Sequence, residues 1–411
     1  MSKKWIALPI AILIIFMFWI MGGVDLLLAR TIFAPDYDPN LVVEEENLQQ
    51  PNDEELEEPF CNEKPPVNIP SVEEKSYSVL DIEYKVEIIG KGLDIPWEIL
   101  PLSDGRVLVT QRPGRIVMLD NGEIYNILDV EHTGEAGLLG MAISPNFEEN
   151  RQLFLYYTYK DGSQLLNRVS RFILQENTLI DETYILDRIP GSRFHNGGRL
   201  KFGPDEKLYI TTGDAQNPDL SQDTSSLAGK ILRINSDGTI PEDNPFENSP
   251  VFAYGLRNPQ GISWHPVSGD LFASDHGPNS QDEINLILPG KNYGWPIVTC
   301  LEKDTKYEDP IACYTAFTLA PSGIDFLPWD NLDEYPLYVA GLRGNMIMRI
   351  DLNDQGGFIR EESMFREYGR IRTVVYYENA LYVATNNRDG RGNIGENDDM
   401  ILKITPILPS K

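Results

Sequence analysis

One short pattern recurs six times along the chain: a turn, a short apolar strand and then a polar residue. The copies begin at residues 106, 152, 207, 270, 336 and 380 and read RVLVTQ, QLFLYYTY, KLYITTGD, DLFASDHG, PLYVAGLRG and ALYVATNN. They lie 44 to 66 residues apart, about 55 on average. Repeats of this length, each holding four short strands, are typical of propeller blades. The sequence therefore predicts an all-β fold, a six-bladed β-propeller.

A second apolar run precedes each copy: IPWEIL, GLLGMAIS, GGRLKFGP, NPQGISWHP, SGIDFLP and IRTVVYY. We expect these runs to form the innermost strand of each blade, with the recurring strand as the antiparallel neighbour. Antiparallel pairing places the start of the first strand and the end of the second at the same edge. Residues at these positions should therefore meet on one face, around the axis. Asn-Gly at 121–122 and Asp-Gly at 237–238 predict hairpin turns between strands.

Two segments precede the repeats. Residues 1–35 contain the uncharged run Trp5–Val24, long enough to span a bilayer, with Lys3 and Lys4 before it. We expect an uncleaved transmembrane anchor with the rest of the chain exported; a cleaved signal peptide would lead to the same compartment. Residues 36–76 hold thirteen acidic residues and two lysines, which predicts a disordered, solvated linker. Residues 77–411 form the predicted propeller.

Charge and cysteine content narrow the class of protein further. The 411 residues carry 63 Asp and Glu against 35 Lys and Arg, a net charge of −28, which argues against nucleic acid as a partner. There are only three cysteines, so a hydrophobic core must carry the fold. Cys300 and Cys313 flank a twelve-residue loop and could form a disulfide worth about 3 kcal/mol in an oxidising compartment. Cys61 is left over in the linker.

Polar and charged residues occupy the positions that should converge. They are Glu135, His195, Arg257, Asn258, Arg370 and Arg372 before the inner strands, and Asp214, His276 and Arg343 after their neighbours. Such crowding predicts a site, although one or two of them, Asn258 among these, could brace blade junctions. His195 and Asp214 stand at the linked ends of one hairpin, so the carboxylate can orient the imidazole as a general base.

The arginines and one loop indicate what the site would bind. Several guanidinium groups together suit a planar polyanion held by forked hydrogen bonds. The segment Asp275–Pro296 is rich in oxygen donors and could bind Ca²⁺; a well-satisfied turn is the alternative. No Walker loop or dinucleotide fingerprint occurs, which argues against ATP and NAD.

Four motifs resemble a known family. FHNGGRLKFGPDEKLYITTGD, YGLRNPQG, SDHGPNSQDEINLILPGKNYGWP and RIRTVV are similar to the soluble quinoprotein glucose dehydrogenases, and more broadly to the glucose/sorbosone or aldose sugar dehydrogenases. The similarity runs in order from about Leu93 to Ile404. It implies a six-bladed propeller that uses pyrroloquinoline quinone (PQQ) and Ca²⁺.

The resemblance also implies a role for each matching residue. His195 falls on the proton acceptor, Asp214 on its carboxylate partner, and Arg257 with Asn258 on the pair that contacts the quinone. Further cofactor contacts fall on Glu135, Arg343, Arg370 and Arg372. The carbonyls of Gly277 and Pro278 would bind the catalytic Ca²⁺, and Glu283 with the carbonyl of Tyr293 a structural one. His276 and Phe194 depart from the best-known member, which has Gln and Asp there, and Arg388 and Arg391 stay unassigned as possible solvated loop residues.

The implied reaction is oxidation of an aldose at C1 to a lactone. His195 would take the hydroxyl proton while hydride passes to C5 of the quinone, with Ca²⁺ and Arg257 stabilising the charge on the quinone oxygen. The sugar cannot be named from the sequence, and neither can the electron acceptor. A non-catalytic binding propeller and a Ca²⁺-dependent lactonase remain the alternatives.

Overall fold

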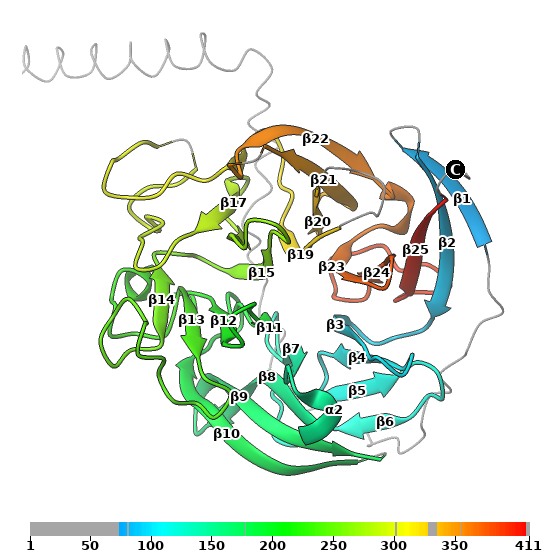
Figure 1. Ribbon diagram of the computed structural model, residues 1–411, viewed down its shortest axis with the longest axis horizontal. Helices are drawn as coiled ribbons and strands as arrows, with labels where there is room; N and C mark the ends of the chain where they lie inside the picture. The colour runs from blue at the N-terminus through cyan, green and yellow to red at the C-terminus, as the bar shows by residue number, and fades with distance from the viewer. Residues whose placement is uncertain are drawn as a thin grey trace, which may run out of the picture. The chain divides into compact units, whose positions relative to one another are not determined.

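The computed structural model describes residues 74–79, 82–176, 178–300, 302–327, 335–353 and 355–407, which form a ring of six antiparallel sheets (Figure 1). Within these ranges, no helix combines the length and the apolar character needed to cross a bilayer. The predicted anchor Trp5–Val24, Cys61 and nearly all of the predicted acidic linker lie outside the described residues. The six-bladed propeller predicted from the repeats is confirmed.

The first three sheets follow the chain in order. The first contains β3 (Pro96–Pro101), β4 (Val107–Gln111), β5 (Arg115–Met118) and β6 (Ile124–Asn126). The second contains β7 (Leu138–Ile143), β8 (Gln152–Asp161), β9 (Gln164–Gln175) and β10 (Thr178–Pro190), with the short helix α2 (Phe147–Asn150) between β7 and β8. The third contains β11 (Leu200–Phe202), β12 (Leu208–Thr212), β13 (Lys230–Ile234) and β14 (Val251–Tyr254), with the 3₁₀ turn η1 (Pro218–Ser221) before β13.

The remaining three sheets complete the ring. The fourth contains β15 (Pro259–Trp264), β16 (Leu271–Asp275), β17 (Asp282–Ile287) and β18 (Ala312–Tyr314). The fifth contains β19 (Pro321–Phe326), β20 (Leu337–Gly341), β21 (Met346–Leu352) and β22 (Phe358–Met364), followed by the 3₁₀ turn η2 (Arg366–Tyr368). The sixth has five strands in the order β1-β2-β25-β24-β23, from β1 (Glu74–Val79), β2 (Ile82–Gly90), β23 (Ile371–Tyr377), β24 (Ala380–Thr385) and β25 (Ile401–Ile407).

The sixth sheet closes the ring by joining the two ends of the propeller. Strand β2 pairs antiparallel with β25, so that Val86 lies opposite Ile404, and β1 pairs with β2 at the sheet edge. This pairing joins segments more than 300 residues apart, with one register irregularity between Ile88 and Gly90, and it closes the seam of the ring. The repeat pattern did not predict this closure, because β1 and β2 precede the first repeat.

The predicted strand roles are confirmed in every blade. Each second apolar run forms an innermost strand (β3, β7, β11, β15, β19 or β23), and each recurring strand pairs antiparallel with it. Asn121–Gly122 lies in the β5–β6 hairpin as predicted. The prediction for Asp237–Gly238 is wrong in part: the turn forms, with Gly238 N–H donating to Asn235, but it lies inside the long connection between β13 and β14.

Glycines let the inner strands approach one another around the axis. A Cβ on Gly140 of β7 would lie 2.2 Å from the carbonyl oxygen of Gly198, and one on Gly261 of β15 would lie 2.2 Å from that of Ser322. On Gly323 of β19 it would lie 2.2 Å from the hydroxyl oxygen of Thr373. Since no side chain fits at such distances, the glycines in GLLG, NPQG and SG are required by the close packing of adjacent blades.

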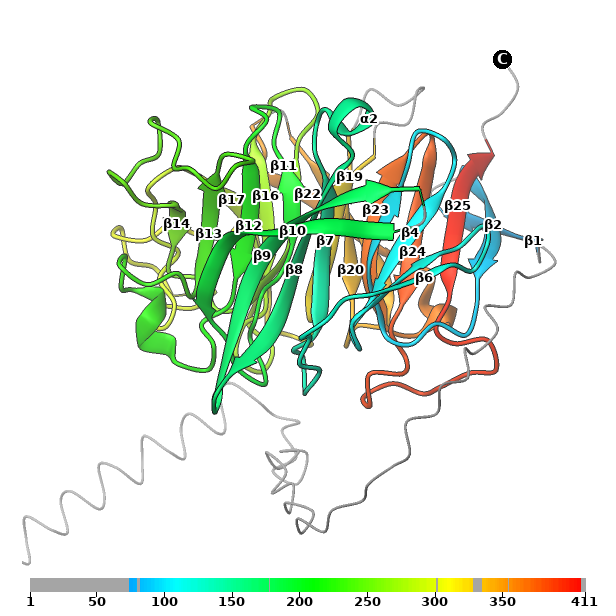
Figure 2. The same cartoon turned by 90° about the horizontal axis from the view of Figure 1, so that it is seen from below.

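The two ends of the inner strands define two faces of the ring. We call the face at which the inner strands begin the entry face, and the opposite one the exit face. Figure 1 looks onto the exit face, which carries α2; in Figure 2 the exit face is at the top and the entry face, with the loop that follows β24, is at the bottom. Buried aliphatic and aromatic side chains fill the spaces between neighbouring blades and hold both faces in place.

Candidate functional site

His195 and Asp214 meet on the entry face as predicted. His195 precedes β11, Asp214 follows β12, and His195 Nδ1 lies 2.8 Å from Asp214 Oδ1. The backbone between them is tight: His195 has φ of 60°, and a Cβ on Gly213 would lie 2.1 Å from the His195 carbonyl oxygen. The glycine before Asp214 is therefore needed to place the carboxylate against the imidazole.

The hydrogen bonds of Asp214 select the tautomer of the neutral imidazole. The carboxylate is fully buried and accepts three hydrogen bonds: Oδ1 from His195 Nδ1 and from Gln216 N, and Oδ2 from Trp295 Nε1 at 2.9 Å. An ionised carboxylate can only accept, so His195 carries its proton on Nδ1. Its Nε2 is then left with a lone pair, as a general base requires.

Glu135 joins three other segments at the entry face. Its Oε2 accepts from His195 N at 3.2 Å and from Asn258 Nδ2 at 3.3 Å, and its Oε1 from Arg391 Nη1 at 2.9 Å. Burial alone would raise the pKa of Glu135, but the nearby charges, of which Arg391 contributes most, lower it to about 2. Glu135 is thus ionised.

Arg391 is a residue of the site that the sequence did not assign. It comes from the loop after β24, and its guanidinium also lies 5.4 Å from the centre of the Phe194 ring, next to His195. Arg193 stacks on the same ring at 5.6 Å. Arg388, the other unassigned arginine, instead donates from Nε to the carbonyl of Asp398 and supports that loop. The only sequence signal for Arg391 was that arginines recur near the predicted site. Its partner Glu135 lies 256 positions away in the chain.

Arg257 and Asn258 occupy the segment before β15 and are anchored by Asp275. The carboxylate of Asp275 accepts from Arg257 N at 2.8 Å and from Asn258 N at 2.6 Å. The Arg257 guanidinium donates to the carbonyl of His276 and lies 5.3 Å from the centre of the Trp295 ring. Burial lowers the pKa of His276 to about 3, so that its imidazole is neutral.

A group of buried arginines lies beside these residues. Arg372, the second residue of β23, donates to Gln260 Oε1 at 2.7 Å. Arg370 forms an ion pair of 2.7 Å with Asp389. Burial, followed by the charges of Arg112 and Arg370, lowers the pKa of Arg372 to about 9. Arg112 was not among the predicted residues; it follows β4, the position that the repeat pattern marks in the other blades.

Several polar atoms of this group lack a partner. Among the described residues, buried atoms without a hydrogen-bond partner include Nε of Arg112, Arg257, Arg370 and Arg372 and Nε2 of His276. Buried donors are normally satisfied, and uncompensated guanidinium groups are costly. The arrangement therefore fits an anionic ligand with several acceptor groups. Arg343 follows β20 on the same face, but its side chain is exposed, and the hydrogen bonds described for it, with Leu319 and Asn345, are made by its backbone.

The predicted metal ligands lie around a cavity of about 10 Å³, room for one ion or water, lined among others by Asp275, Gly277, Pro278, Glu283 and Tyr293. Burial and then the charge of Glu283 raise the pKa of Asp275 to about 8, and burial also raises that of Glu283. Two buried carboxylates with backbone carbonyls suit a hard cation. Within the described ranges, no cluster of three or more His, Cys, Asp or Glu side chains could hold a metal, so a cation here would depend on those carbonyls.

A disulfide braces this part of the fourth sheet. Cys300 and Cys313 are joined, with their Cα atoms 5.5 Å apart. Cys300 N donates to Glu283 Oε1 at 2.8 Å, and Cys313 pairs with Glu283 in the β17–β18 ladder. The cross-link that the sequence left open is therefore formed, and it fixes Cys300, whose N–H binds the carboxylate of Glu283 on β17.

Comparison with known proteins gives a consistent result. The family described as Glucose / Sorbosone dehydrogenase matches residues 93–401. The aldose sugar dehydrogenase YliI of Escherichia coli is 29% identical over 78% of this chain and 92% of its own. The quinoprotein glucose dehydrogenase B of Acinetobacter calcoaceticus is 34% identical over 54% of each chain. A solved structure, the PQQ-bound aldose sugar dehydrogenase of Streptomyces coelicolor, matches with a TM-score of 0.72 and 36% identity, over 79% of this chain and 98% of that one.

Proposed function

Because the chain belongs to the glucose/sorbosone dehydrogenase family, we propose that it oxidises aldose sugars at C1 to lactones, using PQQ and Ca²⁺. The observation that carries the proposal is the pairing of His195 with the buried Asp214, beside a group of buried arginines whose Nε atoms lack a hydrogen-bond partner in the described part of the chain. The proposed reaction needs a base and an anion-binding site side by side, and both lie on the entry face.

The arginines fit the cofactor. PQQ is a planar tricarboxylate, and when bound it supplies the acceptor for the hydride of the sugar. Arg370 and Arg372 would hold its carboxylates, with Arg112 and Arg343 on the same face, while Arg257 would lie against the quinone. The unpartnered Nε atoms and the lowered pKa of Arg372 support this assignment, because an anion would supply the missing acceptors.

His195 acts as the base in the proposed mechanism. Its Nε2 takes the proton of the C1 hydroxyl, and Asp214 stabilises the imidazolium that results. Asn258 and Glu135 hold the backbone on either side: Asn258 Oδ1 accepts from Gly197 N at 3.0 Å, and Glu135 accepts from His195 N. Asp214 thus holds the imidazole ring of His195, and Glu135 and Asn258 hold the backbone beside it.

Two sets of Ca²⁺ ligands were predicted, and both line the cavity that has room for one ion. At the first, the carbonyls of Gly277 and Pro278 would hold a cation next to Arg257, where it would add to the positive charge at the mouth. At the second, Glu283 and the Tyr293 carbonyl would bind a structural ion, and the buried Asp275 beside Glu283 supports a cation there. A cation there would favour the ionised forms of the two carboxyl groups, whose pKa values burial raises in its absence.

The proposed location is outside the cytoplasm, with residues 1–35 as the anchor. The Cys300–Cys313 disulfide supports export, since such bonds persist mainly in oxidising compartments.

The test is turnover of the full chain, reconstituted with PQQ and Ca²⁺, in the presence of aldoses and a redox dye. His195→Ala should bind the cofactor and lose turnover by about 10²–10⁴-fold, the usual contribution of a general base. Asp219→Asn, an exposed substitution in the connection between β12 and β13, is the control and should stay within a few-fold of wild type. Turnover of lactones without any quinone would favour a hydrolase instead, and absence of cofactor uptake a binding module.

A further inference from the structure

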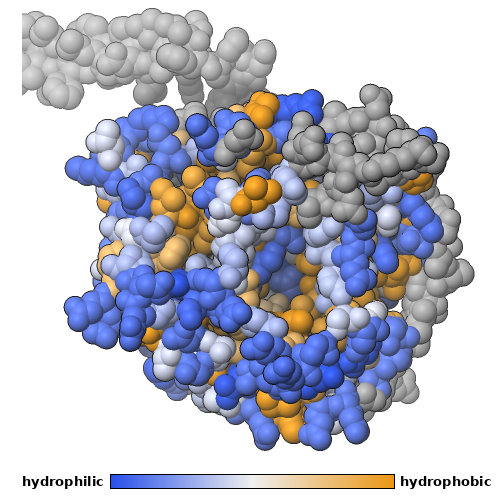
Figure 3. Space-filling view, viewed as in Figure 1, coloured by the Kyte–Doolittle hydropathy of each residue, from blue (hydrophilic) through white to orange (hydrophobic). Residues whose placement is uncertain are grey.

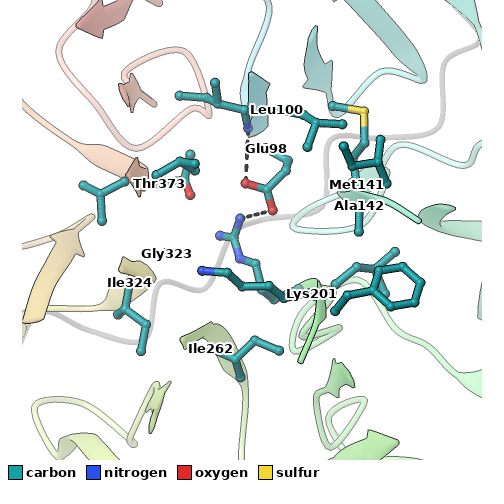
Figure 4. A pocket seen from close by; sticks show the side chains of 16 residues that line it. Glu98, Leu100, Met141, Ala142, Lys201, Ile262, Gly323, Ile324 and Thr373 are labelled. Carbon is teal, nitrogen blue, oxygen red and sulfur yellow. Dashed lines mark hydrogen bonds and ion pairs between the residues drawn. The ribbon is translucent and has the colours of Figure 1, made fainter. Parts of the chain in front are cut away.

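The central channel is closed below the exit face, so that a sugar reaches His195 from the entry face. Figure 3 shows a hollow at the centre of the exit face. Beneath it, Glu98 forms an ion pair with Arg199 (Figure 4), and Lys201 pairs with Asp325 at 2.7 Å. Glu98 and Arg199 are 5% and 4% exposed, so their pair is packed inside the ring and not open to a ligand. The side chains around His195 on the entry face therefore decide which sugar can approach it.

The two residues before His195 belong to a rigid turn on this face. Phe194 N donates to Gln216 Oε1 at 3.3 Å, and the carbonyl of Arg193 accepts from Glu135 N at 2.7 Å. The N–H of His195 itself donates to the Glu135 carboxylate. The backbone that carries the side chains of Arg193 and Phe194 is thus fixed next to the base. Groups held in this way bind a ligand at a lower entropic cost than mobile ones.

Two guanidinium groups flank the Phe194 ring. The guanidinium carbon of Arg193 lies 5.6 Å from the centre of the ring, and that of Arg391 lies 5.4 Å from it. Arg193 is exposed, and the side chain of Arg391 is 50% exposed, so both are open to a ligand. Two cations therefore stand beside His195, next to the place where the proposed mechanism puts C1 of the sugar.

The charges of these two arginines are only partly balanced. Arg391 Nη1 donates to Glu135 Oε1 at 2.9 Å. In the described part of the chain, the Arg193 guanidinium has neither an ion pair nor a hydrogen-bond acceptor. Two cations against one carboxylate leave positive charge beside the base, on a chain whose net charge is −28. Such a local field attracts an anionic ligand, whereas a neutral sugar would gain nothing from it.

The shape of a hexuronic acid matches this arrangement. In its pyranose ring, C1 and the carbon that bears the carboxylate flank the same ring oxygen, so the C1 hydroxyl and the carboxylate lie toward one side of the sugar. Arg193 is likewise separated from His195 by one residue. Guanidinium groups bind the two coplanar oxygens of a carboxylate by forked hydrogen bonds. With its C1 hydroxyl at His195 Nε2, the sugar would thus present its carboxylate to Arg193 and Arg391.

We propose that the substrate is an aldose that carries a carboxylate, such as a hexuronic acid, and that Arg193 and Arg391 select it; this inference rests on the proposed function. Neither arginine is among those assigned to the cofactor, so the carboxylate of the sugar does not compete with the carboxylates of PQQ. The reaction at C1 is unchanged: a hydride and the hydroxyl proton leave, and the C–O single bond becomes the carbonyl of the lactone, with PQQ as the oxidant.

The experiment compares D-glucuronate with D-glucuronamide, which has nearly the same shape and no charge. It uses the full chain loaded with PQQ and Ca²⁺, with dye reduction as the assay and D-glucose as a third substrate. For wild type, kcat/KM for glucuronate should exceed that for glucuronamide at least about tenfold, as one hydrogen bond between charged groups provides. Arg193→Gln and Arg391→Gln should each bring this ratio close to one, and Arg193→Lys should keep most of it. Arg366→Gln removes the same charge from an exposed arginine elsewhere on the entry face and is the matched control, which should keep the wild-type ratio.

A second measurement does not depend on turnover. Methyl β-D-glucuronide has no free C1 hydroxyl and cannot be oxidised. In calorimetric titrations of the loaded chain it should bind at least about tenfold more tightly than methyl β-D-glucoside. Arg193→Gln should remove this difference, and Arg366→Gln should not.

Each outcome decides the question. Turnover of glucose with a glucuronate-to-glucuronamide ratio near one, or with a ratio that Arg193→Gln and Arg391→Gln leave unchanged, overturns this inference and leaves the proposed function standing. Equal binding of the two methyl glycosides overturns it as well. A preference for glucose 6-phosphate over glucuronate would also overturn it, because the selected group would then be a phosphate. Absence of PQQ uptake, or of turnover with every aldose, refutes the proposed function and this inference with it.

Discussion

Replacement of Asp214 by Asn tests how the imidazole of His195 is held. Asp214 offers two oxygens to three N–H donors, from His195, Gln216 and Trp295, and the site is fully buried. Asn keeps the shape of the side chain but has one oxygen and a new NH₂ group. It must therefore turn that group toward either His195 or Trp295.

The two orientations differ in their unpaired donors. With NH₂ toward Trp295, the indole N–H and both amide hydrogens lack acceptors. With NH₂ toward His195, the indole N–H is satisfied and the amide donates to Nδ1 of the other imidazole tautomer, while the Gln216 N–H and one amide hydrogen lack acceptors. Each orientation keeps two hydrogen bonds, but the second leaves two donors unpaired instead of three, an advantage of about 1–3 kcal/mol. It places the proton on Nε2, where the base must be free.

The expected result is a fall in kcat of roughly 100-fold, about 3 kcal/mol, from the lost tautomer and the lost carboxylate charge. Cofactor affinity should change by less than a few-fold, because the bond of Asp214 to Arg257 runs from backbone N–H to backbone carbonyl, which the substitution keeps. Steady-state dye reduction and PQQ titration measure both quantities. Asp219→Asn, an exposed substitution in the same connection, is the control. A kcat within threefold of wild type would refute the assigned role of the His195–Asp214 pair.

Three further predictions concern stability and metal binding. Cys313→Ser, which opens the disulfide to Cys300, should lower the free energy of unfolding by about 3 kcal/mol in denaturant titrations; no change would mean that the loop is ordered without it. Glu283→Gln should abolish the rise in Tm on adding Ca²⁺ in differential scanning calorimetry, and an undiminished rise would place the structural ion elsewhere. The pKa of Glu135 is lowered to about 2, so its contribution to stability is complete above pH 4.5 and is lost as the pH falls toward 2. Relative to wild type, Glu135→Gln should lose about 2 kcal/mol at pH 7, after screening at the half-exposed Arg391, and little at pH 2; parallel stability curves would contradict this.

The architecture and half of the site were predictable because they follow from local pattern. The repeat fixed the number of blades, and antiparallel pairing then required residues such as His195 and Asp214 to meet, since both belong to one hairpin. The pair Arg257–Asn258 was predictable for the same reason. Its anchoring by Asp275 comes from the next strand of the same sheet.

Contacts between distant blades were not predictable in this way. Arg391 reaches Glu135 from the far end of the chain, and nothing in the loop NNRDGRG distinguishes it from a solvated arginine. The closing strand β2 lies before the first repeat and has no pattern of its own. Arg199 stands inside the inner-strand motif HNGGRL, but its ion pair with Glu98 joins two blades, which only the folded ring brings together.

The central claim is that the entry face binds PQQ through its buried arginines, and absorbance titration with PQQ in the presence of Ca²⁺ tests it most directly. The full chain should bind one equivalent, and Arg372→Met should weaken binding at least 100-fold, while Arg366→Met, which changes an exposed arginine paired only with Ser363 among the contacts described for it, should not. Failure of the wild-type chain to bind PQQ, or equal binding by Arg372→Met, would contradict the account.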